Sequence, residues 1–149
     1  TIKQPFLFAR LWQNMYLCHT KFIMLVMQRF VTTYWKTIIC SVCILILSMA
    51  SFSSNKLPTF THADKLVHLM MYLTLKCILF YDYSQKHAVK TFRSYFLLLL
   101  APIFYGGFME IMQGLLTVSR SADGFDMLAN SAGTLVGLVL SSTIYNARR

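Results

Sequence analysis

Charged residues are scarce in this sequence. Asp, Glu, Lys and Arg make up 13% of its 149 residues, whereas hydrophobic residues make up 56%. Ordinary soluble domains carry about 25% charged residues, so this composition excludes that class and fits several bilayer-spanning segments. A chain of this length is expected to form one membrane domain.

Acidic residues are the rarest charged group. The chain has 5 Asp and Glu against 14 Lys and Arg, which gives a net charge of +9. Such an excess can indicate nucleic-acid binding, but here the basic residues are not clustered with aromatic residues on a polar surface. They fall in short segments between apolar runs, where they report membrane topology. We therefore expect no nucleic-acid partner.

Several common functional signatures are also missing. The 4 cysteines form no disulfide framework, because Cys40 and Cys43 lie in the middle of an apolar run, Cys77 lies in another, and Cys18 is isolated. They are interpreted as small apolar residues. The sequence contains no nucleophile elbow, HExxH motif or phosphatase signature. No cofactor is expected, and no set of metal ligands is assigned.

Four apolar segments, taken with their flanks, are long enough to cross a bilayer as helices. They cover residues 37–52, 66–83, 95–118 and 127–145. Lys76 interrupts the second segment, and we expect its side chain to snorkel to the cytoplasmic interface. The predicted fold class is all-α, a bundle of four transmembrane helices.

The distribution of Lys and Arg predicts the orientation of these spans. Ten of these residues fall in the segment up to Lys36, in the connection between the second and third spans, and at the C-terminus. Three fall on the other side, namely Lys56, Lys65 and Arg120. Cytoplasmic loops carry the excess of positive charge, so both termini are predicted to be cytoplasmic.

Two interpretations of residues 1–34 stay open, while residues 35–149 are assigned to the membrane domain. The segment mixes aromatic and aliphatic residues with Lys3, Arg10, Lys21 and Arg29, a mixture typical of an amphipathic helix on an anionic leaflet. Alternatively, the residues before about Met24 are absent from the natural protein.

The second span carries a polar stripe. Asp64, His68, Tyr72 and Lys76 follow one another at i, i+4 steps and therefore share one helix face, and Lys65 lies beside the first of them. Asp64 can orient the imidazole of His68. It also fits a capping box that begins at Thr61, so a purely structural role stays open.

The third span places a carboxylate between two glycines. Gly106, Glu110 and Gly114 share a face, which lets a neighbouring helix or a ligand approach closely, and Gln113 follows. A Glu at this depth needs a partner or takes up a proton. A structural ion pair with Arg120 or His68 is the alternative to a functional role.

The fourth span opens with Asp123 and Asp126, which suit a helix start, and Asn130 extends its polar face inward. Arg120 precedes them and can bind a carboxylate or phosphate, or form a salt bridge. We expect the Glu110 carboxylate to lie within hydrogen-bonding or one-water reach of His68, Arg120, Asp126 or Asn130. The small residues at 129, 133 and 137 are interpreted as scaffold.

In order along the chain, these residues resemble the VanZ-like family of bacterial membrane proteins. The matching pieces are Asp64-Lys65-x-x-His68-x-x-x-Tyr72, Glu110-x-x-Gln113 and Arg120-x-x-Asp123-x-x-Asp126-x-x-Ala129-Asn130-x-x-Gly133. The resemblance covers about residues 35–145. It implies a multi-pass protein of the bacterial inner membrane, linked to resistance to the glycopeptide teicoplanin, without a settled reaction.

Three functions are compatible with these residues. The first is a site at the outer leaflet that binds or remodels an amphiphilic envelope component: a membrane lipid, a lipid-linked precursor or an acylated glycopeptide. The second is an intramembrane hydrolase or transferase acting on a lipid head group, with Glu110, His68 and Asp123 as catalytic residues. A divalent cation on His68, Glu110, Asp123 and Asp126 would strengthen this alternative.

The third function is a small proton-coupled transporter subunit, which would require a homo-oligomer. Whether the chain is an enzyme therefore stays open. The expected ligand-binding residues are Asp64, Lys65, His68, Tyr72, Glu110, Gln113, Arg120, Asp123, Asp126 and Asn130.

The predicted topology can be tested by cysteine labelling in a chain from which the native cysteines have been removed. Asn55→Cys and Ser121→Cys should react with a membrane-impermeant thiol reagent added outside the cell, whereas His87→Cys should be protected, because the positive-inside rule places it in the cytoplasm. Protection of both external positions would refute the topology.

Overall fold

The computed structural model describes residues 4–49, 63–116 and 124–148, and these form four helices. The helices are α1 (Gln4–Met49), α2 (Ala63–Lys86), α3 (Phe92–Leu116) and α4 (Gly124–Ala147). All four are long and apolar enough to cross a membrane. The prediction of an all-α fold with four such helices is confirmed, whereas the cytoplasmic placement of the termini stays a prediction.

The chain divides into two compact units, Thr1–Trp35 and Lys36–Arg149. The first unit holds most of α1, and the backbone leaves helical geometry at its end, at Tyr34 (φ −106°, ψ 19°). The side chains of residues 22–27 are consecutive, apolar and exposed, so apolar surface surrounds this part of the helix. Its assignment as an amphipathic or non-native segment stays a prediction.

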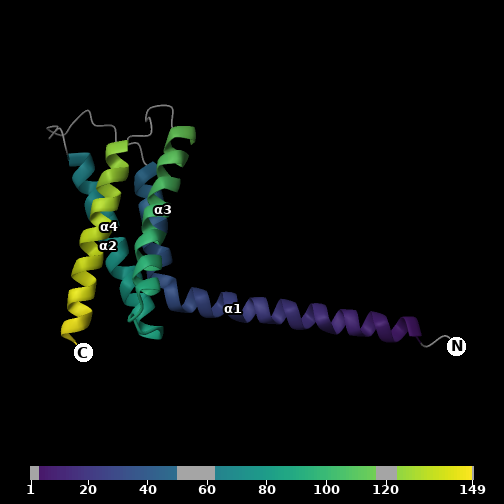
Figure 1. Ribbon diagram of the computed structural model, residues 1–149. Helices are drawn as coiled ribbons and strands as arrows, with labels where there is room; N and C mark the ends of the chain where they lie inside the picture. Colours follow the sequence, from purple (N-terminus) through teal and green to yellow (C-terminus); the bar gives the residue numbers. More distant parts are fainter. Residues whose placement is uncertain (1–3, 50–62, 117–123, 149) are drawn as a thin grey trace. The chain divides into compact units, whose positions relative to one another are not determined.

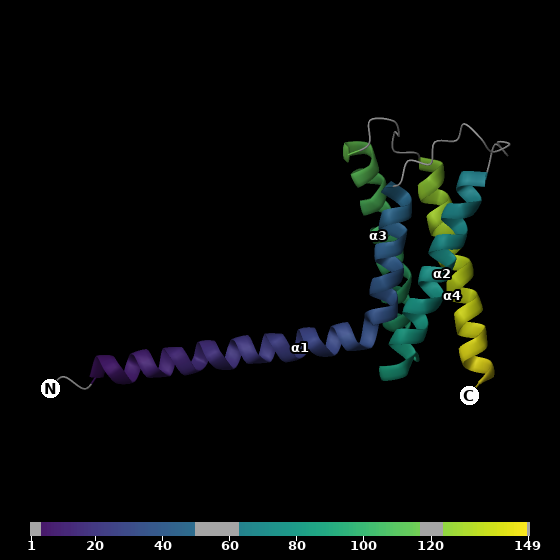
Figure 2. The same ribbon diagram turned by 180° about the vertical axis from the view of Figure 1, so that it is seen from behind.

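The second unit, here called the bundle, contains the end of α1 together with α2, α3 and α4 (Figures 1 and 2). The contacts give the directions of the helices. His68 meets Asn130 and Phe80 meets Tyr145, so α2 and α4 run parallel. Tyr105 and Gln113 bond to Ser41 and Ser48 respectively, so α1 and α3 also run parallel.

The closest helix contact in the bundle joins α2 and α4, and glycines make it possible. A Cβ at Gly133 would overlap the carbonyl oxygen of Leu69, and a Cβ at Gly137 would lie 2.9 Å from the carbonyl oxygen of Leu73. These glycines belong to the small-residue stripe interpreted as scaffold, and such stripes let membrane helices approach backbone to backbone. His68, the residue before Leu69, contacts Asn130 of α4.

The bundle buries many polar residues beside its apolar core and exposes many large apolar ones. Large apolar side chains such as Phe104, Ile111 and Leu135 are exposed, whereas ten polar or charged residues are buried in the part of the chain that the structure describes. The hydrophobic effect would not favour this distribution in water, but it suits a protein surrounded by lipid. The buried polar residues are Ser48, His68, Lys76, Asp82, Glu110, Gln113, Asp126, Asn130, Thr134 and Ser141.

The end of α2 is fastened to α1 by a carboxylate. Asp82 is buried, and its Oδ2 accepts hydrogen bonds from the backbone N–H (3.1 Å) and the hydroxyl (2.8 Å) of Thr37. Thr37 follows soon after the non-helical Tyr34, so its N–H lies in the first turn of a restarted helix. Such N–H groups need an acceptor from outside the helix.

Lys76 does not snorkel as expected from the sequence. Its side chain is fully buried, and its Nζ donates to the backbone carbonyl of Leu98, 2.5 Å away. Pro102 lies four residues after Leu98 in α3 and has no N–H, so this carbonyl lacks its usual helical donor. The ammonium group of Lys76 donates to this carbonyl in place of the missing N–H and so joins α2 to α3. This bond explains why the side chain turns inward and does not snorkel.

Adding one methyl group at the α2–α4 contact should destabilise the bundle. Gly133→Ala is expected to cost about 1–3 kcal/mol, because the backbone of Leu69 must shift. The matched control is Gly107→Ala, also in a helix interior, where a Cβ would meet only the end of Met127 at 3.7 Å. Thermal unfolding in detergent should show a lower Tm for the first variant alone; equal Tm values would contradict the contact.

A double-mutant cycle tests the role of Lys76. Lys76→Met should cost about 1.5–3 kcal/mol, because the Leu98 carbonyl loses a charged donor. In a Pro102→Ala background the cost should fall, since the substituted alanine supplies the N–H that Pro102 lacks. Unfolding of the four proteins measures the coupling, and strictly additive effects would refute the link between Pro102 and Lys76.

Candidate functional site

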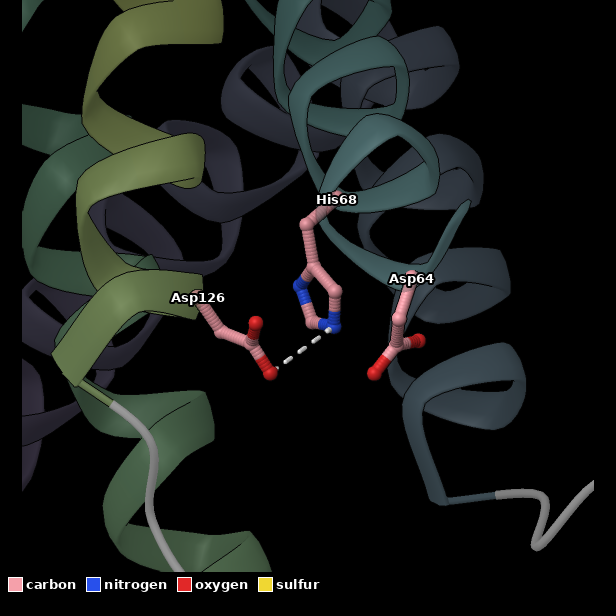
Figure 3. Close-up of side chains that lie close together, drawn as sticks. All are labelled: Asp64, His68 and Asp126. Carbon is pink, nitrogen blue, oxygen red and sulfur yellow. Dashed lines mark ion pairs between the residues drawn. The ribbon is translucent and has the colours of Figure 1, made fainter. Parts of the chain in front are cut away.

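Three titratable side chains meet at the end of the bundle where α2 and α4 begin. Asp64 and His68 come from the first turns of α2, and Asp126 comes from the first turn of α4. The imidazole of His68 points toward the gap between the two carboxylates (Figure 3). These three residues are called the polar cluster below.

The polar cluster is compact and mostly buried. His68 Nε2 lies 3.8 Å from Asp126 Oδ2. One ligand atom from each of the three residues lies within 4.8 Å of the other two. His68 is 3% exposed and Asp126 is 7% exposed, while Asp64 is exposed and so gives the cluster an open side. Titratable groups gathered this closely in the helices of a membrane protein are typical of functional sites.

Asn130 orients the imidazole from behind. Its Oδ1 lies 3.1 Å from His68 Nδ1, in a buried contact between α4 and α2. With the carboxamide oxygen facing Nδ1, this bond forms when Nδ1 carries the proton, and in the neutral ring Nε2 then keeps its lone pair. The lone pair faces the carboxylates, where it can accept a proton or bind a cation.

A second group of polar atoms lies deeper, next to α3. A Cβ at Gly106 would lie 3.2 Å from Cε1 of Tyr72 and 3.4 Å from Nδ2 of Asn130, so the face of α3 that carries Gly106 meets both residues. The Tyr72 hydroxyl and the Asn130 Nδ2 are buried and have no hydrogen-bond partner among the described residues. Glu110, one turn after Gly106, is 7% exposed.

Two other expected ligand-binding residues make contacts outside the polar cluster itself. Gln113 is buried and donates its amide to the backbone carbonyl (3.1 Å) and to the hydroxyl of Ser48 on α1. These bonds join α3 to α1 as a packing contact between the two helices. The Nζ of Lys65 lies 5.1 Å from the ring centroid of Phe125, a cation–π distance that links the starts of α2 and α4.

The structure therefore brings together Asp64, His68, Asp126 and Asn130, and it places Tyr72 and Glu110 on the adjoining helix faces. Arg120 and Asp123 lie outside the described residues. That the Glu110 carboxylate lies within hydrogen-bonding or one-water reach of His68, Arg120, Asp126 or Asn130 stays a prediction.

Sequence reasoning missed Asp82, which serves the opposite end of the bundle. Its position near the end of an apolar run gives no hint of Thr37 as its partner. The acceptor for Lys76 could have been found in the sequence. Pro102 has no N–H, so the carbonyl of Leu98, four residues earlier, lacks its helical donor.

Comparisons with protein-family models, curated proteins and solved structures found no match to this chain. The resemblance to the VanZ-like family consequently stays a prediction that depends on its motif residues.

Proposed function

We propose that this chain is a VanZ-like integral protein of the bacterial inner membrane whose polar site binds or remodels an amphiphilic envelope component. The ligand would be a membrane lipid, a lipid-linked precursor or an acylated glycopeptide. Its polar head would enter between the starts of α2 and α4, and its apolar part would stay in the lipid around the bundle.

One observation carries this proposal. The Tyr72 hydroxyl and the Asn130 Nδ2 are donors on residues that are each 1% exposed, and neither atom has a hydrogen-bond partner among the described residues. Buried polar groups in native proteins are nearly always bonded, and an unbonded one costs about 1–3 kcal/mol. A head group rich in oxygen would satisfy both donors.

The surroundings of these two donors support the same proposal. The exposed Asp64 lies at the open side of the polar cluster, so a head group arriving from the membrane surface would meet the cluster first. Lys65 adds a positive charge beside it, which favours a phosphate or carboxylate on the ligand. The exposed apolar side chains of the bundle would contact the ligand's lipid portion.

A second function, an intramembrane hydrolase or transferase, is favoured by the His68 geometry. When Nδ1 of the neutral ring donates to Asn130, the Nε2 lone pair faces Asp126 and Asp64. An imidazole oriented in this way can act as a general base toward water or a substrate hydroxyl. The transporter alternative gains no such support, because Lys76, the last residue of the polar stripe of α2, is used for a contact with the Leu98 carbonyl of α3.

Growth under teicoplanin tests the proposal, using bacteria that express matched amounts of each variant. His68→Gln, Glu110→Gln and Asp126→Asn should each abolish the resistance that the unaltered chain confers, because each removes a group from the site. The matched control is Asp82→Asn, which makes the same change at a buried carboxylate that serves the far end of the bundle. It should retain resistance.

Lipid that remains bound after purification gives a second measurement, independent of any antibiotic. Native mass spectrometry should detect a bound lipid on the unaltered chain and on Asp82→Asn, but not on His68→Gln or Asp126→Asn. Full resistance of Glu110→Gln would assign Glu110 to packing. No resistance from the unaltered chain would reject the teicoplanin link, and equal lipid retention by all variants would reject head-group binding.

A further inference from the structure

We propose that Asp64, His68 and Asp126 bind one divalent transition-metal cation, with Asn130 as the residue that orients its histidine ligand. Zn²⁺ and Mn²⁺ are the cations that best suit a site of one imidazole and two carboxylates. This cation site goes beyond the proposed function, because a cation can bind there whether or not a head group follows it.

The distances fit a site that closes slightly on its cation. Zinc binds His nitrogen and carboxylate oxygen at about 2.0–2.2 Å, so tetrahedral ligand atoms lie roughly 3.4 Å apart. The Nε2–Oδ2 distance between His68 and Asp126 is already 3.8 Å. The three ligand atoms lie within 4.8 Å of one another, and the exposed position of Asp64 leaves room for the remaining movement of its side chain.

The histidine is held as metal-binding histidines usually are. Such a residue donates its second ring N–H to a carbonyl or carboxylate, which fixes both the tautomer and the ring orientation. Here the Oδ1 of Asn130 lies 3.1 Å from Nδ1 of His68, in a contact that is buried from both sides. The nitrogen that faces the carboxylates is then Nε2, as Figure 3 shows.

Three protein ligands leave coordination positions open on the cation. Asn130 also carries the buried Nδ2 that has no hydrogen-bond partner among the described residues, and the Tyr72 hydroxyl is in the same situation. Both donors lie on the side of the imidazole away from the cation, where Asn130 contacts Nδ1 and where both residues approach Gly106 of α3.

Helix dipoles oppose a cation at this position, but the carboxylates outweigh them. Two helices begin near the polar cluster, and each N-terminus carries roughly half a positive charge. Asp64 and Asp126 each supply a full negative charge within the first turn of their helix. Lys65 adds a further positive charge nearby, so direct coordination by the three side chains, and not the net charge, is what favours a divalent cation here.

Metal titration of the full-length chain in nanodiscs, after treatment with a chelator, tests this site. Isothermal titration with Zn²⁺ should give one cation per chain. Asn130→Ala should weaken binding about 10- to 100-fold, as expected for a residue behind the ligands. Asp64→Asn, His68→Gln and Asp126→Asn should each weaken it further. Asp64 is exposed, so its substitution should leave the fold intact and keep the test valid if a buried variant misfolds.

The control variants are His87→Gln and Asp82→Asn, which remove an exposed histidine and a buried carboxylate away from the polar cluster. Both should bind Zn²⁺ like the unaltered chain. A positive signature comes from His68→Cys titrated with Co²⁺, because a thiolate ligand adds a sulfur-to-cobalt charge-transfer band in the near ultraviolet. The unaltered chain, with its native cysteines, sets the baseline.

Absence of Zn²⁺ binding, or binding that Asp64→Asn leaves unchanged, would overturn the cation site. Head-group binding could still hold in that case, because lipid retention is measured without added metal. Conversely, stoichiometric Zn²⁺ binding without retained lipid would uphold the cation site and reject head-group binding.

Discussion

The backbone contact between α2 and α4 is the constraint on which the rest of the bundle depends. Gly133 sits against the carbonyl of Leu69, and Gly137 sits against that of Leu73, so no side chain separates the two helices. This contact also fixes their register. His68 precedes Leu69 by one residue, and the register places its imidazole against Asn130, one turn before Gly133. Two helices at this distance leave little room for the buried side chains of His68 and Asn130 to rearrange.

Most of the polar groups inside the bundle fasten one helix to another. Asp82 holds the restarted end of α1, Lys76 bonds to the carbonyl that Pro102 leaves open, and Gln113 bonds to Ser48. In lipid these bonds stabilise the bundle, because a polar group that lost its partner could not form a hydrogen bond to water instead. These residues explain why a polar residue in a membrane helix is not by itself a functional one.

The polar cluster differs from these fastening bonds in three respects. It gathers two carboxylates and an imidazole with ligand atoms within 4.8 Å, one of its members is exposed, and donors without a partner among the described residues lie behind it. A pair of groups that only joins two helices needs none of these features. Together they suit a site that takes up something from outside, whether a head group, a cation or both.

The sequence by itself determined the four helices and most of the residues that line the site. Apolar length is a local property, and i, i+4 spacing already places Asp64, His68 and Tyr72 on one face. Only the tertiary structure decided that α2 pairs with α4, that Gln113 bonds to α1, and that Lys76 turns inward to Leu98. The physical reason is that a stripe of small residues allows close packing against another helix but does not specify which helix that is. The choice of partner depends on how all the faces of the bundle pack at once.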